Sequence, residues 1–273
     1  MYHYNPMTVY DRQTLATTAE LAAVAAFACV GADGDPLIEP VAPLLFEGSP
    51  TFTLTYARTD LAQRISSSPR VALVFSDSRL AYVGWNPLSV TAKAQVIPDP
   101  GGKVFREKLL DQELRKFPPD RELIGSLLLQ SENWWYVPRW IVRLLEAGEP
   151  HPVARRTGPH HGVLAYDTGE TLVSETVRVE DWAADRIPIR PFDARTSLPS
   201  EDVPAALFYH DFAIPDMDPR TSMLARGRLT NSRLSVTERG GSTTLDKRPG
   251  LLARWRAQRN LERRCKAGLK EHA

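Results

Sequence analysis

The chain is poor in cysteine, in net charge and in long apolar runs, and each shortage excludes a class of protein. Its 273 residues include two cysteines, Cys29 and Cys265, which lie far apart and without the spacing of a metal site. A disulfide-rich secreted scaffold is therefore excluded, and the cytoplasm is the expected location. The formal net charge is only +1, which argues against a nucleic-acid partner.

Membrane and export signals are also missing. The apolar run at residues 21–30 is too short to span a bilayer, and it leads into a Gly-Asp turn, as a buried strand would. Residues 1–13 lack the basic-then-apolar order of a signal peptide. The sequence also contains no recognisable pattern of a nucleophile–base pair, a carboxylate pair or a metal cluster. The sequence predicts no membrane segment and no metal site.

What the chain does have is a series of short β-rich segments separated by turn residues. Gly and Asp within residues 31–36 predict a tight hairpin, and Pro40 and Pro43 place the next strand at an edge or bulge. Helical patterns occur at residues 59–68 and 103–131, the second split by Pro118 and Pro119. Strands are predicted at residues 24–30, 37–46, 51–57, 69–75, 88–97 and 133–148, with a helix from Pro138 onward as the alternative for the last segment. The order predicts a mainly β fold with helices, an antiparallel barrel of the α+β kind.

A five-residue echo indicates that the second half repeats the first. Ala-Arg-Thr-x-Leu occurs at residues 57–61 and again at 194–198, with Arg58 and Arg195 137 positions apart. Two further segment pairs match at an offset of 134, namely 71–77 with 205–211 and 90–96 with 224–230. A three-residue deletion in the second copy's short helix reconciles the two offsets. The sequence predicts an internal duplication.

The duplication defines the expected domains. Residues 1–148 form the first barrel, and residues 149–161, rich in Pro, Gly, His and Arg, form a linker. Residues 162–273 form a second, more divergent copy that ends in a basic helix.

Residues 30–75 resemble the flavin-binding split-barrel family of pyridoxamine 5′-phosphate oxidase and its relatives. The shared features are the Gly-x-Asp-Gly-x-Pro hairpin, a Pro- and Val-rich strand, a strand that ends in hydroxyl and basic residues, a short helix, and Pro-Arg-Val-Ala-Leu at residues 69–73. Residues 89–97 and 134–144 resemble the family's fifth and closing strands. The resemblance covers residues 15–148 and implies an FMN-binding split barrel, duplicated in one chain.

The resemblance also implies a function. Flavin mononucleotide (FMN) would carry the redox chemistry of an oxidoreductase that acts on a small molecule, while the protein supplies orientation and electrostatics. A deazaflavin or haem is the alternative cofactor in this fold. Family members are usually homodimers with the flavin at the interface, so a duplicated chain implies an intrachain pseudo-dimer and leaves further homodimerisation open. The other alternative is a scaffold protein whose cofactor site has decayed.

In the family, the positions that match residues 56–64 contact the phosphate and ribityl chain, and those that match residues 39–43 border the ring. Arginine forks, hydroxyls and free amides at a helix start suit a phosphate dianion. A second interpretation stays open, in which Thr59 caps a helix and Arg58 pairs with a carboxylate. The predicted FMN-binding residues are Val41, Pro43, Thr55, Tyr56, Arg58, Thr59, Gln63 and Arg64.

Two further groups of side chains have both a functional and a structural interpretation. The aromatic group would either wall a planar ligand or seal the barrel and the interface between copies. The histidines would either ligate haem or lie at the surface or in satisfied positions. The aromatic group is Trp134, Trp135, Tyr136 and Trp140, and the histidines are His160, His161 and His210.

The C-terminal stretch is the most basic part of the chain. Residues 246–271 hold nine Lys or Arg against three Asp or Glu. Either this helix contacts a polyanion, or it packs on the barrel through an apolar stripe and leaves its basic face in water. The predicted stripe is Leu252, Trp255, Cys265 and Leu269.

Overall fold

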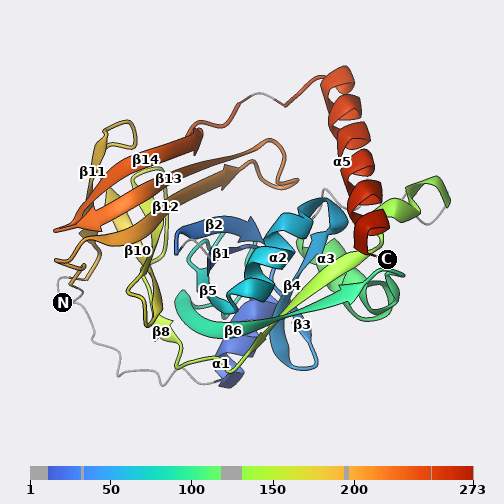
Figure 1. The fold of residues 1–273 in the computed structure, drawn as a ribbon, viewed down its shortest axis with the longest axis horizontal. Helices are drawn as coiled ribbons and strands as arrows, with labels where there is room; N and C mark the ends of the chain where they lie inside the picture. The colour runs from blue at the N-terminus through green and yellow to red at the C-terminus, as the bar shows by residue number, and fades with distance from the viewer. Residues whose placement is uncertain (1–11, 32–33, 118–130, 194–196, 247, 273) are drawn as a thin grey trace.

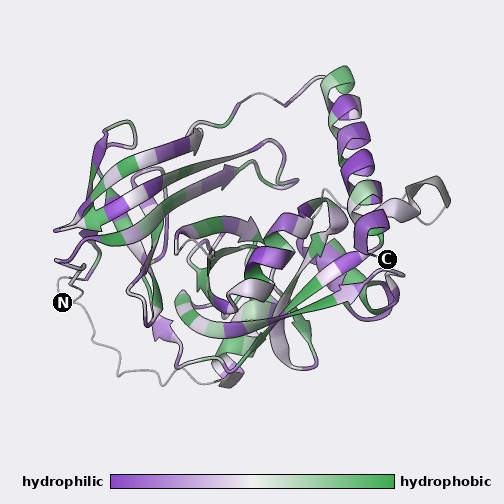
Figure 2. Cartoon of the chain, viewed as in Figure 1, coloured by the Kyte–Doolittle hydropathy of each residue, from purple (hydrophilic) through white to green (hydrophobic). Residues whose placement is uncertain are grey.

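The computed structural model places an N-terminal sheet with helices beside a closed C-terminal barrel (Figure 1). The fold is mainly β with helices, as predicted. Apolar side chains form a core in each β unit, whereas most of the C-terminal helix beyond its first turn is hydrophilic (Figure 2). The structure describes residues 12–31, 34–117, 131–193, 197–246 and 248–272.

The N-terminal sheet is antiparallel throughout and follows the order β2-β1-β5-β6-β7-β4-β3. The single strand predicted at residues 37–46 is two strands, because the chain breaks at Ala42 and Pro43. Phe27, Phe52 and Phe75 are among the fully buried side chains of its core. The strands are β1 (Ala25–Val30), β2 (Pro36–Val41), β3 (Leu44–Phe46), β4 (Ser49–Thr55), β5 (Arg70–Phe75), β6 (Leu88–Asp99) and β7 (Arg139–Leu145).

Helices cover this sheet and carry part of the site. In α2, Leu61, Ala62 and Ile65 recur at helical spacing and are all buried, so the helix docks one apolar face on the sheet. Pro118, Pro119 and the helical segment predicted to follow them lie outside the described residues. The helical elements are α1 (Arg12–Leu21), the 3₁₀ turn η1 (Tyr56–Arg58), α2 (Thr59–Ser67), the π-helical turn η2 (Phe105–Leu109), α3 (Leu110–Lys116) and the 3₁₀ turn η3 (Ser131–Tyr136).

The C-terminal half is a closed six-stranded barrel with the order β10-β11-β14-β13-β12-β9. A bulge at Arg226 and Gly227 shifts the register of β13, and there a Cβ on Gly227 would lie 1.9 Å from the Ser235 carbonyl oxygen. Glycine is therefore required at this close approach. The strands are β9 (His161–Asp167), β10 (Leu172–Val179), β11 (Arg186–Pro191), β12 (Val203–Phe212), β13 (Arg220–Thr230) and β14 (Arg233–Gly241).

The two halves pair their strands in the same order. If β1, β2, β4, β5, β6 and β7 correspond to β9, β10, β11, β12, β13 and β14, each pair of neighbours among these six strands has its counterpart in the barrel, and β3 has none. The contacts between the halves obey the same correspondence: β2 contacts β12 and β13, and β10, the counterpart of β2, contacts β5 and β6. These facts support the predicted duplication, which stays a prediction. Ala194, Arg195 and Thr196 of the echo lie outside the described residues, and residues 197–202 form no helix corresponding to α2.

The segments outside the two β units are closely packed. The expected linker includes β8 (His151–Pro152), which pairs with β6. The helix α5 (Leu251–His272) packs on η1 and η3 of the N-terminal half.

The apolar stripe predicted on α5 is wrong in its first half. Leu252 and Trp255 are 73% and 57% exposed, whereas Cys265 is buried and Leu269 is half-buried. The reason is that α5 meets the N-terminal half only near its C-terminal end (Figure 1). There a Cβ on Gly268 would lie 2.2 Å from the Tyr56 carbonyl oxygen. No helix among the described residues has the length and apolar character to cross a membrane.

Candidate functional site

A cavity of about 510 Å³ lies between the N-terminal sheet and the C-terminal barrel. The first half contributes β2, β4 and α3, and the second half contributes β12, the loop after it and the start of β13. The lining residues are Ala23, Val24, Glu39, Pro40, Val41, Ala42, Thr53, Leu54, Thr55, Arg58, Glu113, Phe117, Tyr136, Arg139, His210, Asp211, Phe212, Met217, Arg220, Thr221 and Ser222.

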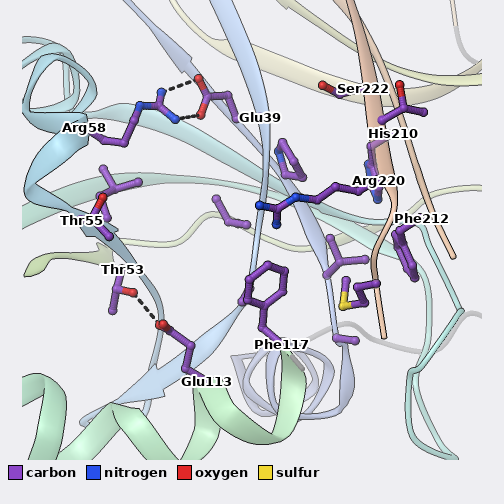
Figure 3. Close-up of a pocket in the computed structure, with 18 of the residues that line it drawn as sticks. Glu39, Thr53, Thr55, Arg58, Glu113, Phe117, His210, Phe212, Arg220 and Ser222 are labelled. Carbon is purple, nitrogen blue, oxygen red and sulfur yellow. Dashed lines mark hydrogen bonds and ion pairs between the residues drawn. The ribbon is translucent and has the colours of Figure 1, made fainter. Parts of the chain in front are cut away.

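The cavity opens where the N-terminal sheet fails to close. Among the described residues β2 and β4 share no backbone pairing, although the corresponding β10 and β11 do. Side chains span the gap instead: Arg58 donates to both carboxylate oxygens of Glu39, at 2.7 Å from Nη1 and 2.5 Å from Nη2 (Figure 3). The hydrogen bonds with Glu39 raise the pKa of Arg58 and hold it charged. The pair is close to neutral as a unit.

This geometry supports one part of the second interpretation, the ion pair of Arg58, and contradicts the other part, the cap by Thr59. Arg58 does pair with a carboxylate, that of Glu39, and Asp60 lies 3.8 Å away as well. Thr59 is not a cap: it is the first residue of α2, and its hydroxyl donates to the Tyr56 carbonyl at 2.9 Å. The Trp140 indole donates to the same hydroxyl at 3.2 Å, which leaves Thr59 turned into the protein.

Three of the eight predicted cofactor residues line the cavity, namely Val41, Thr55 and Arg58. The other five are not among its lining residues, and each has another place. The carbonyl of Pro43 accepts a hydrogen bond from Lys116, and Tyr56 is buried against Trp140. The Thr59 hydroxyl is bonded to the Tyr56 carbonyl, as described above. Gln63 is exposed, and Arg64 donates to the Asp35 carbonyl. Whether any of the eight contacts a flavin stays a prediction.

A second ion pair, between Arg139 and Glu113, lines the floor of the cavity. Arg139 is 1% exposed and its guanidinium lies between the rings of Phe105 and Tyr136, 4.1 Å from each centroid. Its Nη2 lies 3.4 Å from Glu113 Oε1, and the Thr53 hydroxyl donates to the other carboxylate oxygen at 2.7 Å. The negative charge of Glu113 is therefore balanced by Arg139.

A buried lysine holds α3 in place beneath the cavity. The Lys116 ammonium donates to the Pro43 carbonyl at 2.5 Å and to the carbonyl of Ala19 in α1. Burial lowers the pKa of Lys116 to about 7, with Glu20 opposing the shift. Lys116 thus ties α3, and with it the cavity residues Glu113 and Phe117, to the break between β2 and β3.

Arg220 differs from the other arginines of the cavity. Its guanidinium points into the cavity and lies 5.1 Å from the centroid of the Phe117 ring (Figure 3). Within the described part of the chain it has no hydrogen bond or ion pair, whereas Arg58 and Arg139 are paired. The remaining carboxylate of the wall, Asp211, is paired with Arg79. The cavity therefore carries one unbalanced positive charge together with several hydroxyls, an arrangement suited to an anionic group.

A buried charged network joins the two halves behind the cavity. Arg79 contacts both Asp77, at 2.8 Å, and Asp211. Arg156 donates to the His210 carbonyl at 2.7 Å and lies 3.1 Å from Asp77 Oδ2. Burial would raise the pKa of Asp77, but hydrogen bonds with His210 and Arg79 and the charge of Arg156 lower it overall. The network keeps Asp77 ionised inside the interface.

His210 is neutral in this network. Burial, with the charge of Arg156 adding to it and Asp77 opposing it, lowers the pKa of His210 to about 4. Both ring nitrogens lie within hydrogen-bond distance of Arg156 Nη2, so a haem iron would have to displace that contact. His160 and His161 line a separate depression of about 320 Å³ beside Arg178. No group of three His, Cys, Asp or Glu side chains in the described ranges is placed to hold a metal ion.

Different members of the aromatic group fit different interpretations, as a wall for a ligand or as a structural seal. Tyr136 lines the cavity. Trp135 is buried in an apolar cluster with Cys265 of α5, and Trp140 packs on Tyr56 with ring centroids 4.7 Å apart. Trp134 is 60% exposed. Two of the four therefore seal the contact beneath the sheet and one walls the cavity.

Sequence reasoning missed the half of the cavity that the C-terminal barrel provides. Arg220, Phe212 and Ser222 carry no local motif, and neither do Glu113 in α3 and Phe117 directly after it. The available signal was the repeat itself: in an internal dimer, the segment that faces residues 39–43 must come from the second copy.

Comparisons with known proteins do not assign the chain to a family. No protein-family model and no curated protein matches it. Solved structures match about half of it: a conserved hypothetical protein from Mycobacterium tuberculosis is 13% identical, with 54% of this chain and 90% of that chain covered and a TM-score of 0.35. An F420 reductase is 20% identical, covering 50% and 94%, with a TM-score of 0.34. A Clostridium acetobutylicum protein of the pyridoxinephosphate oxidase family is 14% identical, covering 51% and 90%, with a TM-score of 0.33. At TM-scores below 0.5, these likenesses decide nothing about the cofactor or activity of this chain.

Proposed function

We propose that the protein is an FMN-dependent oxidoreductase of the pyridoxamine 5′-phosphate oxidase-like class, acting on a small molecule, and that FMN binds in the cavity between the two halves. The observation that carries the proposal is the unpaired Arg220 guanidinium, aimed into an open cavity that β2 and β4 border. The sequence resemblance implies a flavin beside β2 and the turn that follows β4.

The lining fits FMN in size and in chemistry. A volume of about 510 Å³ lies within the range of cofactor pockets. Arg220 would hold the phosphate, and the hydroxyls of Thr55, Thr221 and Ser222 suit the ribityl chain. A flat ring would lie against the apolar and aromatic side chains, namely Val41, Phe117, Tyr136, Phe212 and Met217.

The charge arrangement favours an anionic cofactor. Glu39, Glu113 and Asp211 would repel a phosphate if they were free, but each is paired with its own arginine. The cavity is also open rather than filled by side chains, which supports a binding function over a scaffold with a decayed site. Bound FMN would supply the electron transfer, and the chain's residues would hold it, orient it and exclude water.

A visible spectrum of the purified protein, followed by titration with FMN, tests the proposal. We expect absorbance near 450 nm, or quenching of flavin fluorescence on addition of FMN. An Arg220→Ala variant should weaken FMN binding by about 10- to 100-fold, because a charge-assisted hydrogen bond contributes about 1.5–3 kcal/mol. Arg233→Ala is the matched control, since Arg233 is an exposed arginine away from the cavity.

Four outcomes would contradict the proposal or its choice of cofactor. Colourless protein that ignores FMN would exclude it, and equal FMN affinity in the Arg220→Ala and Arg233→Ala variants would remove its basis. Tight binding of a deazaflavin without binding of FMN would change the cofactor. A Soret band that vanishes in a His210→Ala or His160→Ala/His161→Ala variant would favour haem.

A further inference from the structure

Strand registers give a residue-by-residue correspondence between the two halves. Phe27 of β1 pairs with Glu39 of β2, and Leu164 of β9 pairs with Glu175 of β10. On the opposite edge, the partners of Phe27 and Leu164 are Leu73 and Leu207. The second pair of partners is 134 positions apart, the offset at which the sequence repeats. Glu175 therefore occupies the place of Glu39.

The cavity consequently has a counterpart on the other side of the interface. The cavity lies between β2 and the β12–β13 pair, so its counterpart lies between β10 and the β5–β6 pair. At an offset of 134, Asp77 takes the place of Asp211 and Ser76 that of His210. In a symmetric dimer of split barrels both places would be equivalent. Here they differ.

Residues 151–156, which connect the two halves, lie in this counterpart and contact both of its walls. On the β10 wall, His151 Nε2 lies 2.9 Å from Glu175 Oε1, and the Ala154 amide donates to the Thr176 hydroxyl at 2.9 Å. On the β6 wall, the two residues of β8 pair with Leu88 and Ser89. Glu175 is thus engaged by the connecting segment, whereas its counterpart Glu39 faces an open cavity.

The end of the segment is fixed most firmly. The Arg156 amide donates to the Ser76 carbonyl at 2.8 Å, and its guanidinium reaches the buried Asp77. The Arg156 side chain is 3% exposed. Val153 is 9% exposed and belongs to the apolar cluster between the halves, together with Ala72 and Val163. These bonds and contacts are those of a core element rather than of a loose linker.

We propose that residues 151–156 plug the second of two pseudo-equivalent cofactor sites, so that the chain binds one FMN per two β units. The inference rests on the proposed function for the identity of the ligand, but the seating of the plug does not. A symmetric split-barrel dimer has two such sites. Fusing the two copies in one chain converts one of them into the seat of the connecting segment.

Equilibrium titration of the full chain with FMN, followed by flavin fluorescence, tests the stoichiometry. We expect one equivalent per chain, and in the Arg220→Ala variant we expect the whole signal to weaken without a residual tight phase. Two equivalents in the wild type, of which one stays tight in Arg220→Ala, would overturn the plug while leaving an FMN function standing.

Amide hydrogen exchange tests the plug without any ligand. The amides of Ala154 and Arg156 should exchange at least about 100-fold more slowly than in an unfolded peptide, because both are hydrogen-bonded inside the interface. Exchange at the rate of an unfolded peptide would overturn the plug. Slow exchange in a protein that takes up no FMN would instead refute the proposed function alone. On saturation with FMN, protection should rise in residues 39–42 and 220–222 and stay unchanged in residues 151–156.

Discussion

The two halves of the chain pair their strands in the same order but form different structures, an open sheet and a closed barrel. In the second half, β10 and β11 pair through Val177–Pro191 and two further residue pairs, and the barrel closes. In the first half, the corresponding β2 and β4 share no backbone pairing among the described residues, and the Glu39–Arg58 ion pair spans the gap. β2 contains two prolines, which cannot donate to a strand ladder, whereas β10 contains none. Space for a ligand arises where a barrel remains split.

The two corresponding sites at the interface also differ, because one is open and the other is filled. One side keeps a cavity with an unpaired arginine, and the other is filled by the connecting segment. Polar groups in corresponding positions therefore have different tasks: Glu39 balances an arginine at a cavity, and Glu175 holds a backbone segment. Four experiments on matched positions test this contrast, from the largest expected effect to the smallest.

Removing the anchor of the connecting segment should have the largest effect. Arg156→Ala leaves the buried Asp77 with one cationic partner fewer, and breaking a buried ion pair costs about 3–5 kcal/mol of unfolding free energy. Urea unfolding measures the loss. The adjacent Arg155→Ala is the control, because Arg155 is exposed and should cost less than about 1 kcal/mol. Equal losses in the two variants would show that the network does not hold the interface.

Lowering the pH should weaken the interface through His210. Its folded pKa of about 4 lies below the ordinary 6.5, so the unfolded chain binds the proton more readily between these values. The unfolding free energy should therefore fall by about 3 kcal/mol as the pH drops from 6.5 to 4. Asp77, whose pKa is lowered beside Arg79 and Arg156, adds its own loss only below its ordinary value of 3.8.

Urea unfolding at several pH values between 7.5 and 4 measures this dependence. A His210→Gln variant should have a shallower slope between pH 6.5 and 4, because glutamine does not titrate. The corresponding residue of the first half, Ser76, does not titrate either, which makes the effect specific to one side of the interface. An unchanged slope in His210→Gln would contradict the assignment.

A methyl group at Gly268 should lift α5 from the N-terminal half. The added Cβ would lie 2.2 Å from the Tyr56 carbonyl oxygen, and overpacking of this kind costs about 1–3 kcal/mol. Thermal unfolding compares it with Gly250→Ala, where no atom lies within 4 Å of the new Cβ. Because α5 rests on η1, which carries Arg58, the Gly268 variant should also weaken FMN binding. Unchanged stability would mean that α5 does not sit on this turn.

The smallest effect should come from releasing Arg58. Glu39→Gln removes its charge partner, so a second cation becomes free at the cavity and FMN should bind about 5-fold more tightly, about 1 kcal/mol for a partly exposed pair. The counterpart Glu175→Gln should leave FMN affinity unchanged. Weaker binding in Glu39→Gln would show that Glu39 itself contacts the ligand, and equal effects in both variants would abolish the distinction between the two sides.

Much of the fold followed from local sequence patterns. The hairpin after β1 and the short helix predicted at residues 59–68 are present, because turn residues and buried-face spacing act over a few positions. The stripe on α5 was mispredicted because helical spacing says which residues share a face, not how far along the helix that face meets another surface. The capping role of Thr59 was wrong because the 3₁₀ turn before α2 moved the helix start by one residue.

By itself, the sequence predicted most of the N-terminal strands, the helix after Arg58 and the corner at Thr55–Thr59 where a phosphate was expected. Only the tertiary structure decided which charges remain available there. Arg58 is balanced by Glu39 from a strand 19 positions earlier, Arg220 enters the cavity from the other half, and residues 151–156 fill the opposite side. Ion pairs and cavities depend on which distant segments meet, and a local pattern carries no information about that meeting.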